Sequence, residues 1–224
     1  MEHKGNMYED TITWNFLAGK CPHNCSYCST NALMRYPGVA KKYTGELRYC
    51  HIKLKKPQPG QTVFVVGQND LFADVVPSEL IREVLTVCRS FDYEFLFQSK
   101  NPARMKDFAQ LFPEKTILCT TIETNRIYPQ MGNTPCPVDR SLAMLDHVLA
   151  GFITQITIEP IMDFDLEELT DMIYYATPNQ VNIGADSKGN HLPEPSKEKI
   201  LALVSELEKF TKVRFKSNLS RIVK

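Results

Sequence analysis

The sequence predicts an α/β fold: a partial (β/α)6 barrel of the TIM type, with a parallel sheet in a single domain. Short runs of β-branched and aromatic residues alternate with helical patterns of about 10–15 residues along the chain. One run, QTVFVVG at residues 61–67, is apolar throughout, which is typical of a parallel strand covered on both faces. Six such strand–helix units suit a partial, open barrel with right-handed crossovers.

The individual elements follow from these runs and from the residues that interrupt them. Gly19 ends the first run, and Pro37 with Gly38 ends the helical pattern that comes next. Pro77 and Ser78 open another helix, because both residues suit a first turn. We expect strands at 11–17, 61–67, 93–98, 116–121, 153–158 and 180–183, with a further short strand at 213–216 as a candidate. We expect helices at 26–36, 77–90, 102–111, 138–149, 166–176 and 196–210.

The composition indicates a single domain, residues 1–224, without a net charge. The 26 Lys and Arg equal the 26 Asp and Glu, which does not exclude a local basic groove. No stretch approaches the ~20 apolar residues that span a bilayer, and the N-terminus is polar. We therefore expect a cytoplasmic protein with no membrane partner and reduced cysteines. Three segments lie outside the repeating units: an N-terminal extension at 1–10, an irregular insert at 39–60 and a basic C-terminal tail at 211–224.

Three cysteines on one short loop form the strongest pattern in the chain, spaced Cys21-x-x-x-Cys25-x-x-Cys28. Three thiolates can hold three corners of a cubane iron–sulfur cluster, and with no fourth cysteine nearby one iron stays open for chemistry. A zinc site or a disulfide pair is the alternative. Zinc needs a fourth ligand, and the nearby candidate, His23, lies inside the loop and is badly placed to close a tetrahedron.

The spacing, with the aromatic Tyr27 just before the last cysteine, resembles the signature of the radical S-adenosylmethionine (SAM) superfamily. The resemblance implies a [4Fe–4S] cluster on Cys21, Cys25 and Cys28 and a SAM molecule on the open iron. It also implies that an electron from the cluster cleaves SAM to a 5′-deoxyadenosyl radical, and that Tyr27 contacts the adenine. A reductant of the flavodoxin or ferredoxin type is then a required partner.

Polar side chains fall at the ends of the predicted strands, where the active sites of α/β barrels lie. The resemblance implies that most of them contact SAM. The amides and the carboxylate after the second strand would bind the SAM ammonium group, and Lys100 would bind the SAM carboxylate. The expected SAM contacts are Tyr27, Gly67, Gln68, Asn69, Asp70, Lys100, Thr121 and Glu123. Glu159 and Asp186, at the ends of the fifth and sixth strands, are expected to face the substrate and are catalytic candidates.

Two narrower resemblances run through most of the chain. Asn69 with Asp70, Lys100, and a hydroxyl after the fourth strand are similar to spore photoproduct lyase, a DNA-repair radical SAM enzyme. Its hydrogen-donor cysteine aligns with Gly67, so the same repair chemistry is not expected here. The run at 69–77, with residues 99–104 and 158–160, also resembles a phage-associated group of short radical-SAM-like proteins.

Cys119 is a third catalytic candidate, as a hydrogen-atom donor. It lies two residues before Thr121 and four before Glu123, so strand alternation places all three on one face, with Cys119 deepest. Packing of a small side chain is its alternative role. Trp14 and Cys88 are expected in the core.

Three functions stay open from the sequence. The first is a radical SAM enzyme acting on a nucleotide or nucleic acid base, which the basic tail (Lys209, Lys212, Arg214, Lys216, Arg221 and Lys224) would contact through phosphates. The second is a radical SAM enzyme acting on a peptide or small metabolite. The third is a non-enzymatic zinc or iron–sulfur protein with a structural or redox-sensing role. Residues 39–60 and 130–137, and the C-terminus, are candidates for a lid over the site.

Overall fold

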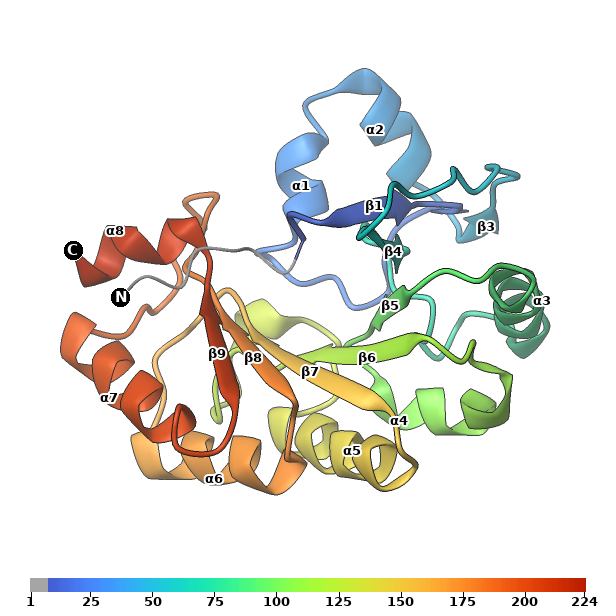
Figure 1. Cartoon of the computed structure of the whole chain (residues 1–224). Coiled ribbons are helices and arrows are strands. Elements are labelled where there is room, and N and C mark those ends of the chain that lie inside the picture. The colour runs from blue at the N-terminus through green and yellow to red at the C-terminus, as the bar shows by residue number, and fades with distance from the viewer. Residues whose placement is uncertain (1–7) are drawn as a thin grey trace.

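The computed structural model describes residues 8–224 as a curved parallel sheet with helices on its outer face (Figure 1). Seven strands follow the order β1-β4-β5-β6-β7-β8-β9, and every neighbouring pair is parallel. They are β1 (Thr11–Trp14), β4 (Thr62–Val65), β5 (Phe95–Gln98), β6 (Thr116–Thr121), β7 (Ile153–Ile158), β8 (Gln180–Ile183) and β9 (Lys212–Phe215). Because β1 and β9 are the edges and do not pair, the barrel is open, and the predicted fold class is confirmed. Of the expected N-terminal extension, residues 1–7 lie outside the described part.

The helices connect successive strands as predicted. They are α3 (Ser78–Arg89), α4 (Pro102–Met105), α5 (Pro137–Leu149), α6 (Leu166–Ala176) and α7 (Lys197–Leu207). A further short helix, α8 (Ser220–Val223), follows the last strand. The short 3-10 turns are η1 (Lys106–Leu111), η2 (Pro129–Met131) and η3 (Ser217–Leu219). The helix predicted at 102–111 is therefore one α-turn followed by a 3-10 segment. Among residues 8–224, no helix is both long and apolar enough to cross a bilayer.

The N-terminal quarter departs most from the prediction. The strand expected at 11–17 is two strands, β1 and β2 (Leu17–Ala18), and β2 pairs antiparallel with β3 (Arg48–Tyr49). The helix expected at 26–36 is α1 (Ser29–Leu33), and Pro37 does not end it but begins α2 (Pro37–Tyr43). Proline lacks the N–H that the first turn leaves unbonded, so it opens a helix as readily as it stops one.

Two apolar clusters hold the sheet to its helices. The first packs α3 and the 3-10 segment η1 on β4 and β5, and includes Trp14 and Cys88, as predicted. The second packs α6 and α7 on β7 and β8, with Leu203 and Val181 fully buried. Each such side chain contributes about 1.5–3 kcal/mol by leaving water. The carboxyl edge of the sheet is thereby held rigidly, and the functional side chains project from that edge.

Candidate functional site

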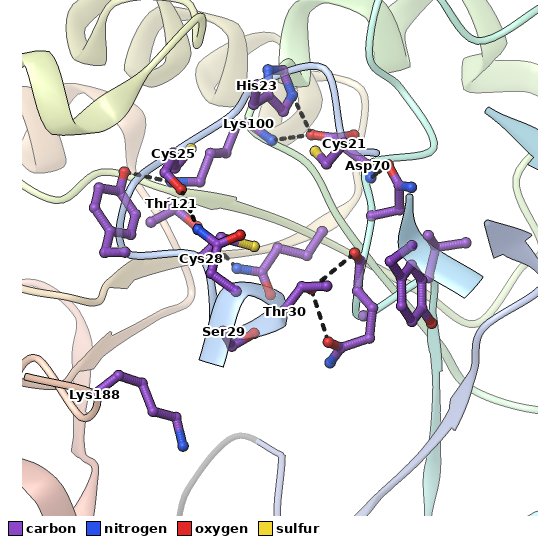
Figure 2. A pocket seen from close by; sticks show the side chains of 18 of the residues that line it. Cys21, His23, Cys25, Cys28, Ser29, Thr30, Asp70, Lys100, Thr121 and Lys188 are labelled. Carbon is purple, nitrogen blue, oxygen red and sulfur yellow. Dashed lines mark hydrogen bonds and ion pairs between the residues drawn. The ribbon is translucent and has the colours of Figure 1, made fainter. Parts of the chain in front are cut away.

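A large cavity lies at the carboxyl ends of the strands, where the sequence analysis placed the site. Its volume is about 880 Å³, within the range of small-molecule sites. Figure 2 shows the three cysteines on one turn of chain beside Lys100 and Asp70, with Lys188 on the other side of the cavity. Twelve of the predicted residues line the cavity: Cys21, Cys25, Tyr27, Cys28, Gly67, Gln68, Asn69, Asp70, Lys100, Thr121, Glu159 and Asp186. Cys119 and Glu123 do not line it.

In the cysteine loop (residues 21–28), Cys25 is buried and Cys21 and Cys28 are half-buried. The Cys28 N–H donates to the Cys25 carbonyl at 3.2 Å, and the Cys25 thiol donates to the Met131 carbonyl at 3.1 Å. Burial, helped by the nearby Asp70 carboxylate, raises the pKa of Cys21 to about 12, and burial raises the pKa of Cys25 as well. The Cys21 and Cys25 thiols therefore keep their protons until a metal centre displaces them.

Asp70 ties the cysteine loop to the sheet. Its carboxylate oxygens lie 2.8 Å from Nε2 of His23, in the loop, and 2.7 Å from the donating hydroxyl of Ser99, at the end of β5. They also accept from the backbone N–H groups of Phe72 at 2.9 Å and Lys100 at 2.8 Å. Burial alone would raise the pKa of Asp70, but these hydrogen bonds hold it below its usual range. Asp70 lines the cavity, yet protein groups already occupy both of its oxygens.

A second buried network ties down the other end of the loop. The Tyr27 hydroxyl donates to Glu123 Oε1 at 2.5 Å, and Lys100 Nζ donates to the same Glu123 oxygen and to the Tyr27 oxygen, the latter at 2.7 Å. Arg140, on α5, donates to the other Glu123 oxygen at 2.9 Å and to the Thr121 carbonyl. Burial alone would raise the pKa of Glu123, but Lys100 and Arg140 outweigh it and lower the pKa to about 2. Burial, with the Glu123 charge, raises the pKa of Tyr27.

Glu123 therefore sits behind Tyr27 and Lys100 rather than on the cavity surface. It was expected to contact SAM, but its side chain is fully buried and its oxygens have three side-chain partners. Sequence reasoning missed Arg140 altogether. A usable signal existed, because Arg140 precedes the buried Ala143 and Met144 by one helical turn and so falls on the inward face of α5.

The chain between β6 and α5 supports the cysteine loop from behind. Backbone N–H groups of Ser26 and Asn133 donate to the carbonyls of Gln130 at 2.9 Å and His23 at 2.7 Å. Gly132, at φ +66°, permits this approach, because a Cβ there would lie 2.1 Å from the His23 carbonyl oxygen. None of residues 130–137 lines the cavity, and their role as a lid stays a prediction.

The turn after β4 supplies backbone and amide groups to the cavity. Asn69 Nδ2 donates to the Gly19 carbonyl at 3.0 Å, and Gln68 Oε1 accepts from the Thr30 hydroxyl at 3.0 Å. Val66, a β-branched residue, has φ 60°, which is strained backbone of the kind found at functional sites. At Gly67 a Cβ would lie 3.0 Å from the Phe64 ring, so the chain passes close to that side chain.

The far wall of the cavity carries an ion pair. Lys216 Nζ donates to both oxygens of Glu159, at 2.5 and 2.6 Å, and lies 5.0 Å from the centre of the Tyr8 ring. Asp186 accepts from the backbone N–H groups of Lys188 at 3.1 Å and Asn190 at 2.6 Å, which shapes its loop. Glu159 and Asp186 therefore both line the cavity with their oxygens engaged, and their contact with a substrate stays a prediction.

Cys119 lies deeper in the barrel, below the cavity floor. Its side chain is fully buried, with Sγ 3.4 Å from the Thr157 hydroxyl oxygen, and burial raises its pKa to about 12. Strand alternation correctly placed it below Thr121, but it packs with Leu96 and Tyr8 and does not reach the cavity surface.

Three cysteines around one cavity are the donor set of a cubane cluster, in which each cysteine binds a different iron. Among residues 8–224, no three His, Cys, Asp or Glu side chains form a site for a single metal ion.

No family model and no curated protein matches the chain in sequence. Among solved structures with this fold is spore photoproduct lyase with bound AdoMet and dinucleoside spore photoproduct, at TM-score 0.62 and 12% identity, over 92% of this chain and 75% of that one. Another structure of the lyase, with dinucleoside spore photoproduct, matches at TM-score 0.63 and 13% identity, over 89% and 75%. Spore photoproduct lyase is a radical SAM enzyme, so the predicted resemblance is confirmed at the level of the fold.

Proposed function

We propose that this protein is a radical SAM enzyme in which Cys21, Cys25 and Cys28 hold a [4Fe–4S] cluster and SAM occupies the adjoining cavity. One observation carries the proposal: the three cysteines line a single cavity at the carboxyl edge of an open parallel barrel. The fold is shared with a protein that has been solved with AdoMet bound. When bound, the cluster supplies one electron that breaks the C5′–S bond of SAM, releasing methionine and a 5′-deoxyadenosyl radical that removes a hydrogen atom from the substrate.

The residues around the cavity supply binding and orientation. Lys100 is a cation on the cavity wall, with its side chain 18% exposed, and is available to the SAM carboxylate. Asn69 and Gln68 present amides beside the cysteine loop, and the Tyr27 ring lies in the same wall. Asp70 and Glu123 position other residues of the site: Asp70 holds His23, and Glu123 holds Lys100 and Tyr27.

The substrate would approach from the wall opposite the cysteines. That wall carries Glu159, Lys216, Asp186 and Lys188. The C-terminal tail is a weaker candidate for phosphate contact than the sequence suggested, because Lys209, Lys216 and Arg221 are already in ion pairs. A reductant of the flavodoxin or ferredoxin type would supply the electron, which agrees with the cytoplasmic location predicted above.

The test is SAM cleavage by anaerobically reconstituted protein reduced with dithionite. We expect iron and sulfide to bind and 5′-deoxyadenosine to form, as measured by chromatography. Cys25→Ala should lose both the iron and the product. Cys88→Ala is the matched control: it removes a buried thiol from α3, so it should cost about 1–3 kcal/mol of stability while leaving iron and product unchanged.

Zinc bound at one equivalent without 5′-deoxyadenosine would end the proposal in favour of the structural or sensing alternative. Loss of iron from Cys88→Ala at full folding would instead show that the cluster ligands are wrongly assigned.

A further inference from the structure

Positive charge is concentrated in one segment of this neutral protein. Residues 20–56, here called the basic cap, contain eight of the 26 Lys and Arg but one of the 26 Asp and Glu. The acidic residue is Glu46. The basic residues are Lys20, Arg35, Lys41, Lys42, Arg48, Lys53, Lys55 and Lys56, and all but Lys42 are exposed. The rest of the chain is correspondingly acidic.

The cations of the basic cap have no acidic partners within the described chain. None of the eight is in an ion pair between residues 8 and 224, whereas ten basic side chains outside the cap are. Like charges gathered without partners repel one another and do not stabilise the fold. Their concentration therefore points to an anionic partner.

The basic cap is held by hydrogen bonds up to Arg48 and is not a loose tail there, whereas residues 50–56 have no regular secondary structure. The N–H groups of Gly19 and Lys20 donate to the carbonyls of Lys42 at 2.8 Å and Gly45 at 2.9 Å. The Arg48 guanidinium donates to four carbonyls around the end of α2, those of Lys41, Lys42, Thr44 and Glu46. Figure 1 shows α1 and α2 standing together above β1.

The cap also runs into the cavity and carries an aromatic side chain. Lys20, Tyr43 and Thr44 line the cavity, so the cap adjoins the cavity at these residues. Tyr36 is 50% exposed, and the Arg35 guanidinium lies 5.0 Å from the centre of its ring. An exposed aromatic among unpaired cations is the combination that binds single-stranded nucleic acid, with phosphates on the cations and a base stacked on the ring.

We infer that the basic cap binds a single-stranded nucleic acid segment and presents one nucleotide to the cavity. Chemistry on a base requires that the base leave its stack and enter a pocket, and this cavity adjoins the charged surface. The entry of that nucleotide rests on the function proposed above, whereas the binding itself does not. An acidic redox protein is the competing partner. The extent of the charge along the whole cap, with Tyr36 among it, favours the nucleic acid.

The test is the binding of a fluorescein-labelled single-stranded oligonucleotide of about 20 nucleotides, longer than the ~4–16 that a small domain contacts. Fluorescence anisotropy of the reconstituted protein should show an affinity that falls with salt. The variant Lys41→Gln/Lys53→Gln/Lys55→Gln removes three exposed cations whose side chains make no hydrogen bond among residues 8–224. It should bind about tenfold or more weakly at low salt, and the slope of log K against log salt should fall by about 2.

The matched control, Arg82→Gln/Lys106→Gln/Lys209→Gln, removes the same charge from ion-paired positions outside the cap. It should keep the wild-type affinity. Equal weakening by both variants would show that only net charge matters and would overturn the inference.

Two further readouts separate the inference from its competitor and from the proposed function. Reduction of the cluster by a flavodoxin, compared with dithionite, should be unchanged in the cap variant. If that reduction fails while the oligonucleotide binds as before, the cap is a redox-protein surface and the inference is wrong. Formation of 5′-deoxyadenosine with dithionite, in the absence of substrate, tests the proposed function alone. If 5′-deoxyadenosine forms but the oligonucleotide does not bind, the inference is wrong and the proposed function stands.

Discussion

Glu123 takes part in most of the charged interactions inside the site. It is a fully buried carboxylate held by Lys100, Arg140 and Tyr27, which belong to three different elements of the chain. A buried charge of this kind is costly unless it is paired and hydrogen-bonded, and here it is both. Its partners include a cavity-lining lysine and the aromatic of the cysteine loop, so the same interactions stabilise the fold and position the site.

Glu123→Gln should change how stability depends on pH. The folded pKa of about 2 lies below the ordinary value of 4.5, so ionised Glu123 stabilises the protein above about pH 4.5, and this contribution is lost as the pH falls toward 2. In the iron-free protein, the wild-type free energy of unfolding should drop across that window by of order 3 kcal/mol more than that of the variant. Denaturant unfolding followed by circular dichroism measures this. Glu79→Gln, an exposed carboxylate on α3, should keep the wild-type profile.

If Glu123→Gln kept the wild-type profile as well, Glu123 would not be the group that titrates, and the buried network would need a different protonation state.

At the scale of elements, the cysteine loop depends on the segment behind it more than on its own hydrogen bonds. Residues 130–133 supply a carbonyl to the Cys25 thiol and exchange backbone hydrogen bonds with the loop at Ser26 and His23. The two segments are about 110 residues apart in sequence, and Gly132 brings their backbones together. A loop held in this way can present its thiols in one arrangement before any metal arrives.

Gly132→Ala should therefore loosen the cysteine loop. The added Cβ would lie 2.1 Å from the His23 carbonyl oxygen, so either the loop or the supporting segment must move. We expect lower iron content after reconstitution and a lower thermal midpoint. Gly151→Ala is the control, because Gly151 also has a positive φ, +87°, but has no heavy atom within 4 Å of the new Cβ. It isolates the backbone strain of about 1 kcal/mol from the steric clash.

Equal iron content in the two glycine variants would mean that the contact behind the loop has no part in forming the site.

Across the whole molecule, one continuous sheet joins two apolar clusters. Leu118 on β6 belongs to the first cluster and Ile122, just after β6, to the second. Because β6 pairs with both β5 and β7, the two halves share a strand, and we expect them to unfold together. Trp14, the one tryptophan of the chain, reports on the first half by its fluorescence.

Leu203→Ala, in the second cluster, tests this cooperativity. It should lower the free energy of unfolding by about 2–5 kcal/mol, and the transitions followed by Trp14 fluorescence and by circular dichroism should shift together. Leu85→Ala is the matched variant in the first cluster and should behave in the same way. A Leu203→Ala protein whose dichroism shifts while its Trp14 fluorescence does not would contain two independently folding halves.

Local sequence patterns predicted a helix or strand correctly where the pattern is compatible with one kind of secondary structure. The strand at 116–121 and the helix at 166–176 agree with β6 and α6 at both ends, because β-branched runs and amphipathic spacing leave few alternatives. Prediction failed at Pro37, which suits both the end and the start of a helix. It also missed β3, in residues 39–60, which pairs with β2 about thirty residues earlier in the chain.

The sequence alone determined the parallel open barrel, the cysteine spacing and the edge of the sheet at which polar residues gather, because each depends on neighbours along the chain or on strand direction. Tertiary structure decided which of those residues reach the cavity. Thr121 faces the cavity whereas Glu123, two residues further on, is buried by Arg140, Lys100 and Tyr27, and Asp70 is engaged by His23 and Ser99. These outcomes depend on which charges meet across the fold, and residues far apart in sequence meet only once the whole chain has folded.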